Sequence, residues 1–207
     1  METEEEQVEK LKGWFKENGA SIVLGILIGV GGIGGYNYWM HVQETKAAEA
    51  SSHYTQMIEA LSAGNNDTVQ QQAEILLSDY ASTDYALMGQ LALAKSHVAN
   101  GDFDNAETAL QHVVGNAAQK PVAFVARIRL AAVQAQAGQY DAALTSLAIE
   151  FPSEFAAGVE ELRGDIYALQ GKSAEAIEAY QKAQLADPQP ANGEFLQQKL
   201  DDLGGRG

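Results

Sequence analysis

The chain contains no cysteine and carries few basic residues. The absence of thiols excludes disulfides, thiolate metal sites and cysteine nucleophiles. Thirteen Lys and Arg residues stand against 28 Asp and Glu residues, so the formal net charge is −15. A surface of this sign repels nucleic acid and anionic lipid headgroups. We therefore expect no nucleic-acid partner.

Sequence motifs of catalysis are also missing. There is no GxSxG nucleophile motif and no phosphate-binding loop ending in GKS or GKT. No two of the four histidines lie four residues apart, which is the spacing that places two metal ligands on one helical face: His41, His53, His97 and His112. We expect a protein that is not an enzyme and has no catalytic residue, cofactor or metal.

One long run without charged side chains covers residues 18–43. Its apolar part, residues 20–36, approaches the roughly 20 residues that an α-helix needs to cross a bilayer. Bulky residues follow the apolar part, where a signal peptide would carry a small-residue cleavage site. Aromatic residues suited to the two membrane interfaces lie at the two ends of this apolar part: Trp14, Phe15, Tyr36, Tyr38 and Trp39. We predict one transmembrane helix over residues 18–40.

Glycines recur within this run. Gly29, Gly31 and Gly34 spell GxGxxG, but the dinucleotide-binding fingerprint requires a βαβ unit that does not follow here. In lipid, small residues four apart allow two helices to approach closely. Gly25 with Gly29, and Gly31 with Gly35, have this spacing and are candidate packing positions. The alternative is that glycine is simply common in membrane helices.

Basic residues near the run predict its orientation, because Lys and Arg are enriched on the cytoplasmic side. Lys10, Lys12 and Lys16 precede the run. Only Lys46 follows it closely, and the next basic residue is Lys95. We expect the N-terminus in the cytoplasm and the longer C-terminal part outside it.

The C-terminal part contains an internal repeat. The phrases NGDFDNAETAL, AGQYDAALTSL and QGKSAEAIEAY align, with turn glycines at Gly101, Gly138 and Gly171. Glycine can adopt the left-handed conformation that ends a helix, and cap or first-turn acceptors follow it: Asp102, Asp104, Asp141 and Ser173. Small residues that let paired helices approach come five positions after each turn glycine: Ala106, Ala143 and Ala176. The pattern predicts helix, tight turn and helix, three times.

The last repeat, residues 158–188, resembles a tetratricopeptide repeat. Its signature positions are filled by Gly164, Tyr167, Gly171, Ala176, Tyr180, Ala183 and Pro188. Glu160 and Arg163 depart from the large apolar residues usual in the first helix. The earlier repeats are degenerate at two of these positions: Ala94 and Ala131 replace the first glycine, and His97 and Gln134 replace the tyrosine.

We therefore predict an all-α protein, with one N-terminal transmembrane helix followed by a tetratricopeptide-repeat-like helical-hairpin solenoid and a C-terminal capping helix. We expect a cytoplasmic tail over residues 1–17, the transmembrane helix over 18–40 and a repeat domain over 41–207. Within the repeat domain, the four expected units cover residues 53–80, 86–116, 121–150 and 157–188, and the capping helix covers residues 192–203.

In repeats of this kind, the first helix of each pair lines a concave groove. Aligning the turn glycines places nine residues on that side: Met88, Leu91, Lys95, Val98, Val125, Ile128, Ala132, Glu161 and Asp165. An apolar groove rimmed by charge suits a helix or an unfolded segment. The same positions face the core if the register slips by one residue. Lys95 alone does not reproduce the basic clamp with which some members of the superfamily bind a C-terminal carboxylate.

The whole architecture resembles the YfgM family of Gram-negative bacteria, ancillary subunits of the SecYEG translocon. The resemblance covers nearly the full length and includes the phrases GWFKENG (13–19) and DYASTDYALMGQLALAK (79–95). It implies an inner-membrane protein with a periplasmic domain. The implied partners are SecYEG, a PpiD-like periplasmic chaperone, unfolded secretory or outer-membrane chains, and a cytoplasmic response regulator of a stress response, restrained by the tail.

Two other functions stay open on the residues alone. The first is an envelope-assembly scaffold that uses the same repeat fold without the translocon, because this fold serves many kinds of partner. The second is a regulator that acts through the tail, with the exported domain as its sensor.

Overall fold

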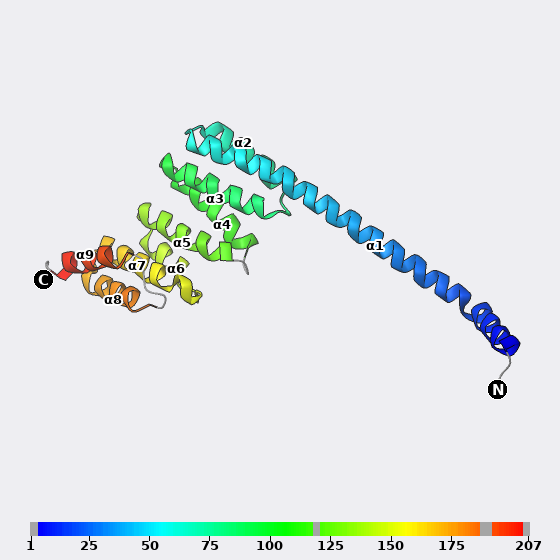
Figure 1. Ribbon diagram of the computed structural model, residues 1–207. Coiled ribbons are helices and arrows are strands. Elements are labelled where there is room, and N and C mark those ends of the chain that lie inside the picture. Colours follow the sequence, from blue (N-terminus) through cyan, green and yellow to red (C-terminus); the bar gives the residue numbers. More distant parts are fainter. Residues whose placement is uncertain (1–3, 118–120, 187–191, 205–207) are drawn as a thin grey trace. The chain divides into compact units, whose positions relative to one another are not determined.

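The computed structural model describes residues 4–117, 121–186 and 192–204, and within them the chain forms nine α-helices and no strand (Figure 1). The chain divides into two units, residues 1–49 and 50–207. Helix α1 (Glu4–Ser62) contributes its longer part to the first unit and its last turns to the second.

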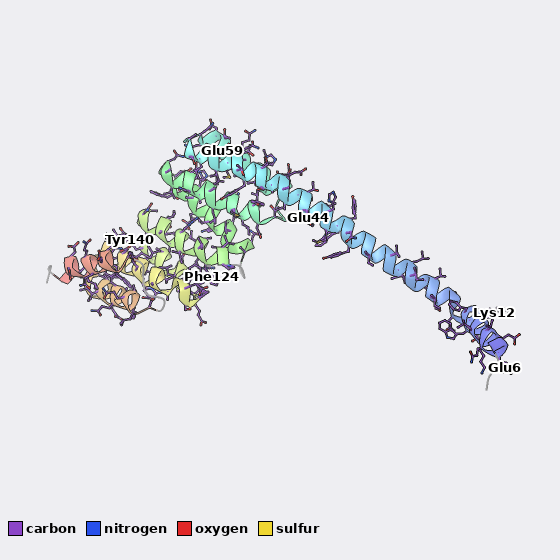
Figure 2. The ribbon with its side chains drawn as sticks, viewed as in Figure 1. Glu6, Lys12, Glu44, Glu59, Phe124 and Tyr140 are labelled. Atoms are coloured by element: carbon purple, nitrogen blue, oxygen red, sulfur yellow. The ribbon has the colours of Figure 1, made fainter. Side chains whose placement is uncertain are left out.

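The first unit contains the predicted span. The described part of α1 near the N-terminus has a mean hydropathy of 1.7 over its most apolar stretch, none of which is buried within the protein. By length and composition this helix can cross a membrane. Lys12 lies in the charged segment before the span (Figure 2). The flanking aromatic rings pair on each side: Trp14 with Phe15 at 5.3 Å between centroids, and Tyr36 with Trp39 at 6.2 Å.

The second unit is a succession of helical hairpins. After α1, its helices are α2 (Asn66–Asp79), α3 (Asp84–Ala99), α4 (Phe103–Asn116), α5 (Pro121–Gln136), α6 (Tyr140–Ser146), α7 (Ser153–Leu169), α8 (Ser173–Gln184) and α9 (Gly193–Gly204). Consecutive helices are in contact from α2 to α9, and α5 also contacts α7 (Figure 1). The predicted all-α repeat fold is confirmed.

The turns between paired helices follow the sequence prediction. The predicted turn glycines Gly101, Gly138 and Gly171 have positive φ angles of 75° to 77°, and Gly64, which ends the turn after α1, has a φ of 70°. An L-amino acid with a side chain is strained in this region, so glycine is the residue that suits these four turns. Asp102 then caps α4, because its carboxylate accepts a hydrogen bond from the backbone N–H of Asn105 at 3.3 Å.

Small residues bring the paired helices together. Ala106, Ala143 and Ala176 are fully buried. In α7, Gly164 faces the ring of Tyr180 on α8, and a methyl group at this position would overlap ring atoms of Tyr180. The two degenerate repeats have alanine instead, and Ala94 and Ala131 are also buried. Pro188, the last expected signature residue, lies outside the described residues.

Polar contacts replace the signature tyrosine in the degenerate repeats. Gln134 is buried, donates to Glu107 at 2.8 Å and accepts from the hydroxyl of Ser146 at 2.7 Å. His97 lies beside Asp102, with its Nδ1 3.2 Å from the carboxylate. The contacts with Ser146 and Asp102 connect the first helix of a pair to the residues that form or begin the second helix, whereas the contact with Glu107 joins α5 to α4 of the preceding pair.

The two unusual residues of α7 form a contact between helices. Arg163 donates to the Glu160 carboxylate at 2.8 Å and to the backbone carbonyl of Leu147 at 3.1 Å. Leu147 is the C-cap of the short helix α6, where backbone carbonyls lack a helical partner. The departure from apolar residues at these positions therefore joins α7 to the end of α6.

Candidate partner-binding site

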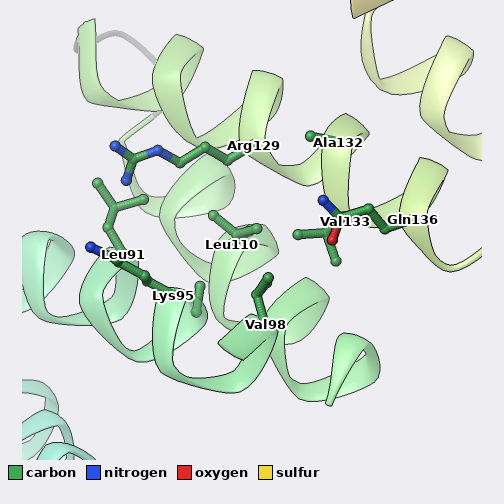
Figure 3. Close-up of a pocket in the computed structure, with 9 residues that line it drawn as sticks. Leu91, Lys95, Val98, Leu110, Arg129, Ala132, Val133 and Gln136 are labelled. Carbon is green, nitrogen blue, oxygen red and sulfur yellow. The ribbon is translucent and has the colours of Figure 1, made fainter. Parts of the chain in front are cut away.

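The face made by the first helices contains an apolar hollow between α3, α4 and α5 (Figure 3). Its volume is about 380 Å³. We call it the first hollow; it is lined mainly by aliphatic side chains, with two basic residues and an amide: Leu91, Ala94, Lys95, Val98, Leu110, Arg129, Ala132, Val133 and Gln136. Cavities of this size and composition are typical of ligand-binding sites.

A second hollow of about 510 Å³ lies next to it, between the last turns of α1 and helix α3. It too is mainly apolar, and it is lined by Tyr54, Ile58, Leu61, Ser62, Met88, Leu91, Ala92, Lys95, Ala99 and Arg129. Three residues line both hollows: Leu91, Lys95 and Arg129. These three side chains therefore form the boundary between the two hollows.

The two basic residues at this boundary are exposed to solvent. Figure 3 shows the Arg129 and Lys95 side chains on either side of Leu91. Among the residues that the structure describes, neither Lys95 nor Arg129 forms an ion pair or a side-chain hydrogen bond. In a protein with a net charge of −15, they are two positive groups available to a ligand beside apolar surface.

The residues expected along the groove on α3 do lie at the hollows. Met88 and Leu91 line the second hollow, and Leu91, Lys95 and Val98 line the first. Leu91 and Val98 also pack against the core cluster that contains Leu110. Leu91 and Val98 therefore line a hollow, as the groove interpretation predicts, and also contact the core, as the alternative predicts.

Of the residues on α5 that we expected in the groove, one lines the first hollow, one packs against the core and one lines neither hollow. Ala132 lines the first hollow, together with Arg129, which the sequence interpretation did not include. Ile128 packs against a different core cluster, around Ala131 and Leu147. Val125 is half-buried and lines neither hollow. Arg129 lies four residues after Val125 and three before Ala132, so helical periodicity could have identified it.

The acidic residues Glu161 and Asp165 on α7 contact the capping helix. The Lys199 ammonium of α9 donates to Glu161 at 2.8 Å and to Asp165 at 2.7 Å, and the Asn192 amide donates to Glu161 at 3.0 Å. Tyr180 donates its hydroxyl proton to Asp165 at 2.7 Å. Neither Glu161 nor Asp165 lines either hollow; with Lys199 they form a contact between α7 and α9.

The pKa values of this cluster follow from its contacts. Burial raises the pKa of Glu161, but hydrogen bonds from Asn192 and Lys199 outweigh burial and leave the pKa below its ordinary value. Burial lowers the pKa of Lys199, but hydrogen bonds to Asp165 and Glu161 outweigh burial and raise the pKa above its ordinary value. Burial, with the hydrogen bond to Asp165, raises the pKa of the Tyr180 hydroxyl. The charged forms of Lys199 and Glu161 are therefore stabilised at neutral pH.

The glycines of the span have open space beside them in the chain as described. A methyl group added at Gly25, Gly29, Gly31 or Gly35 would meet no other atom within 4 Å, apart from the helix's own nearby backbone. That these four glycines pack against another helix in lipid stays a prediction from their spacing.

Among the described residues, no three His, Asp or Glu side chains come together as metal ligands. The hollows offer a ligand apolar surface and two cations.

Comparison with known proteins agrees with this fold. A family model described as a tetratricopeptide repeat-like domain matches residues 12–205. MamA (residues 41 to the end) from Desulfovibrio magneticus RS-1 superposes with a TM-score of 0.55 at 20% identity, over 75% of this chain and 89% of that one. A tetratricopeptide repeat protein from Parabacteroides merdae superposes with a TM-score of 0.52 at 17% identity, over 74% of this chain and 57% of that one. The chain is a tetratricopeptide-repeat-like protein, and at these identities the structural likeness shows the fold alone.

Relatives of known name identify the family within the tetratricopeptide-repeat-like proteins. A protein of Escherichia coli strain K12 named ancillary SecYEG translocon subunit is 33% identical over 202 residues, which cover 98% of this chain and 97% of that protein. The protein of the same name from Haemophilus influenzae is 30% identical over 200 residues, with 97% of each chain covered. The chain therefore belongs to the YfgM family, as do these two relatives.

Proposed function

We propose that this protein is an ancillary subunit of a bacterial SecYEG translocon, anchored in the inner membrane by one helix. The similarity over nearly the whole length to proteins named for that role carries the proposal. The candidate span near the N-terminus supports it, because a translocon partner that is itself membrane-embedded can contact a transmembrane helix. The N-terminus lies in the cytoplasm, as the lysines before the span favour.

In this proposal the repeat domain acts in the periplasm. Its two hollows hold a segment of a PpiD-like chaperone or of an emerging secretory or outer-membrane chain, and the protein brings that partner to the translocon. Two adjacent apolar hollows of about 380 and 510 Å³ support a binding role of this kind. The acidic tail, residues 1–17, restrains a cytoplasmic stress-response regulator; the family resemblance supports this part.

Co-purification tests the proposal. Tagged full-length protein, extracted from membranes in mild detergent, should retain the SecY, SecE and SecG proteins and a periplasmic chaperone. A partner list dominated by outer-membrane or cell-wall assembly proteins would instead favour the envelope-scaffold function. Absence of the translocon from the wild-type preparation would refute the proposal.

Matched glycine variants test the role of the span. Gly29→Ile places a bulky side chain on the face shared with Gly25, whereas Gly34 lies on the opposite side of the helix, so Gly34→Ile is the control. If the span docks through the Gly25 and Gly29 face, Gly29→Ile should reduce SecY recovery several-fold and Gly34→Ile should leave it unchanged. Equal recovery with both variants would remove this face from the proposal.

Deletion of part of the tail tests whether restraint of the stress response is separate from binding to the translocon. A variant that lacks residues 2–9 but keeps Lys10, Lys12 and Lys16 preserves the basic residues that favour the orientation. It should still co-purify with the translocon while the stress response is no longer restrained. Loss of translocon recovery together with the stress phenotype would instead assign both functions to the tail.

A further inference from the structure

The boundary between the two hollows has a specific chemical character. Lys95 and Arg129 line both hollows and have no ion-pair partner among the described residues. Apolar residues lie to each side, with Val98 and Ala132 in the first hollow and Met88 in the second. Two unpaired cations between two apolar surfaces are complementary to a ligand that has a negative group between two apolar groups.

We propose that this face binds a partner segment in which one internal Asp or Glu lies between two apolar side chains. The carboxylate lies against Lys95 and Arg129, and the apolar side chains enter the two hollows. The inference rests on the proposed function only in that the occupant is a polypeptide segment. It adds the sequence pattern by which such a segment is selected.

An internal carboxylate fits this geometry better than a C-terminal one. A chain that ended at the two cations would place apolar side chains on one side only and leave the other hollow without an occupant. Charge also selects the partner, because a chain of net charge −15 disfavours acidic segments in general, and Lys95 and Arg129 provide local positive charge. The cations therefore supply specificity, and the hollows supply apolar burial.

Synthetic peptides test the pattern on the full-length protein in detergent. The reference peptide has a central Glu with one Leu on each side, separated by small polar residues, and its C-terminus is amidated. Matched peptides replace Glu by Gln, replace Glu by Lys, replace either Leu by Ser, or move the only carboxylate to a free C-terminus. The reference peptide should bind about tenfold more tightly than each of these, because a charge-assisted contact or a buried aliphatic side chain is typically worth at least ~1.4 kcal/mol.

Charge reversal in the protein provides the decisive comparison. The double variant Lys95→Glu with Arg129→Glu should lose binding to the Glu peptide and gain binding to the Lys peptide. Lys172→Glu carries the same type of charge change at an exposed turn residue away from the hollows, and it should leave peptide preference unchanged. If the double variant does not fold, Lys95→Gln and Arg129→Gln are measured singly, each with the Glu and Gln peptides.

Four outcomes would overturn the inference. The first three are equal binding of the Glu and Gln peptides, retention of the Glu preference in the folded charge variants, and no binding of any peptide in the set. Stronger binding of the free C-terminal carboxylate peptide would also overturn it and would indicate terminal-carboxylate capture. Because these measurements contain no translocon, each of these results leaves the co-purification test of the proposed function intact.

Discussion

At the scale of single residues, the ring of Tyr180 limits the size of the side chain that α7 can have at position 164. Its ring is buried against Gly164, where a methyl group would overlap the ring, and its hydroxyl is fixed by Asp165. Gly164→Ala should lower the free energy of unfolding by about 1 to 3 kcal/mol, because the rigid ring has to move. Gly158→Ala is the control in the same helix. It has open space and should stabilise by up to about 1 kcal/mol through helix propensity. Thermal and urea unfolding measure both, and equal effects would contradict the contact.

A second pair of variants separates the hollows from the core. Ile128 packs against the core cluster of Ala131 and Leu147, so Ile128→Ser should cost about 2 kcal/mol or more. Met88 is 38% exposed and lines the second hollow, so Met88→Ser should change stability by no more than about 1 kcal/mol while weakening peptide binding. Unfolding curves and peptide titrations on both variants check this. The reverse order of stabilities would show that Met88, and not Ile128, packs in the core.

Local rules explain which of these residues could be predicted from the sequence. Gly101, Gly138 and Gly171 were predicted correctly because a positive φ is a property of the residue and its turn. Arg129 was missed and Ile128 was placed in the groove, because successive residues differ by about 100° around a helix. An alignment error of one position in a degenerate repeat therefore moves a side chain from one surface to another.

At the scale of the helices, α9 is held partly by charge. Glu161 has a lowered pKa, so its contribution to stability is present above its ordinary value of 4.5 and is lost as the pH falls further through the folded-state value. Lys199 has a raised pKa, so its contribution is present below 10.5 and is lost only as the pH rises past its folded-state value. Between these limits the Lys199 contact with Glu161 is complete.

This cluster gives a pH-dependent prediction. Lys199→Met should destabilise the protein by about 1 to 2 kcal/mol at pH 7, and the difference from wild type should shrink as the pH falls below the ordinary pKa of Glu161. Lys182→Met removes a lysine from an exposed pair with Glu178 and serves as the control, with an unfolding curve near that of wild type. Unfolding measured across the acid range checks both. A difference that stays constant with pH would show that Lys199 acts through packing alone.

The sequence identified the helices better than the contacts between them. The hairpins follow from repeated turn phrases, and the expected cap at residues 192–203 corresponds closely to α9 (Gly193–Gly204). The shortness of α6, which ends at Ser146, was not foreseen. The backbone carbonyl just beyond it accepts from Arg163 on the next helix, and such a contact has no signature in the local sequence.

For the molecule as a whole, the lysines before the span predict the topology. Protease added outside spheroplasts should digest the repeat domain beyond about residue 40 and leave the short N-terminal tail protected. Detergent-permeabilised samples provide the control, because the tail should then be cleaved as well. A repeat domain that resists external protease while the tail is digested would reverse the orientation.

The covering of the last hairpin by α9 has a consequence for crowding in the membrane. Leu196 is fully buried against the cluster of Tyr180 and Ala183, while Asp201 and Asp202 are exposed on the same helix. An uncovered terminal hairpin would present a surface shaped to receive another hairpin, and identical chains joined head to tail in that way form open-ended fibres. Copies anchored by the candidate span would share a thin layer beside the bilayer, where their effective concentration would be high. We therefore expect the charged outer side of α9 to disfavour such stacking between neighbouring molecules.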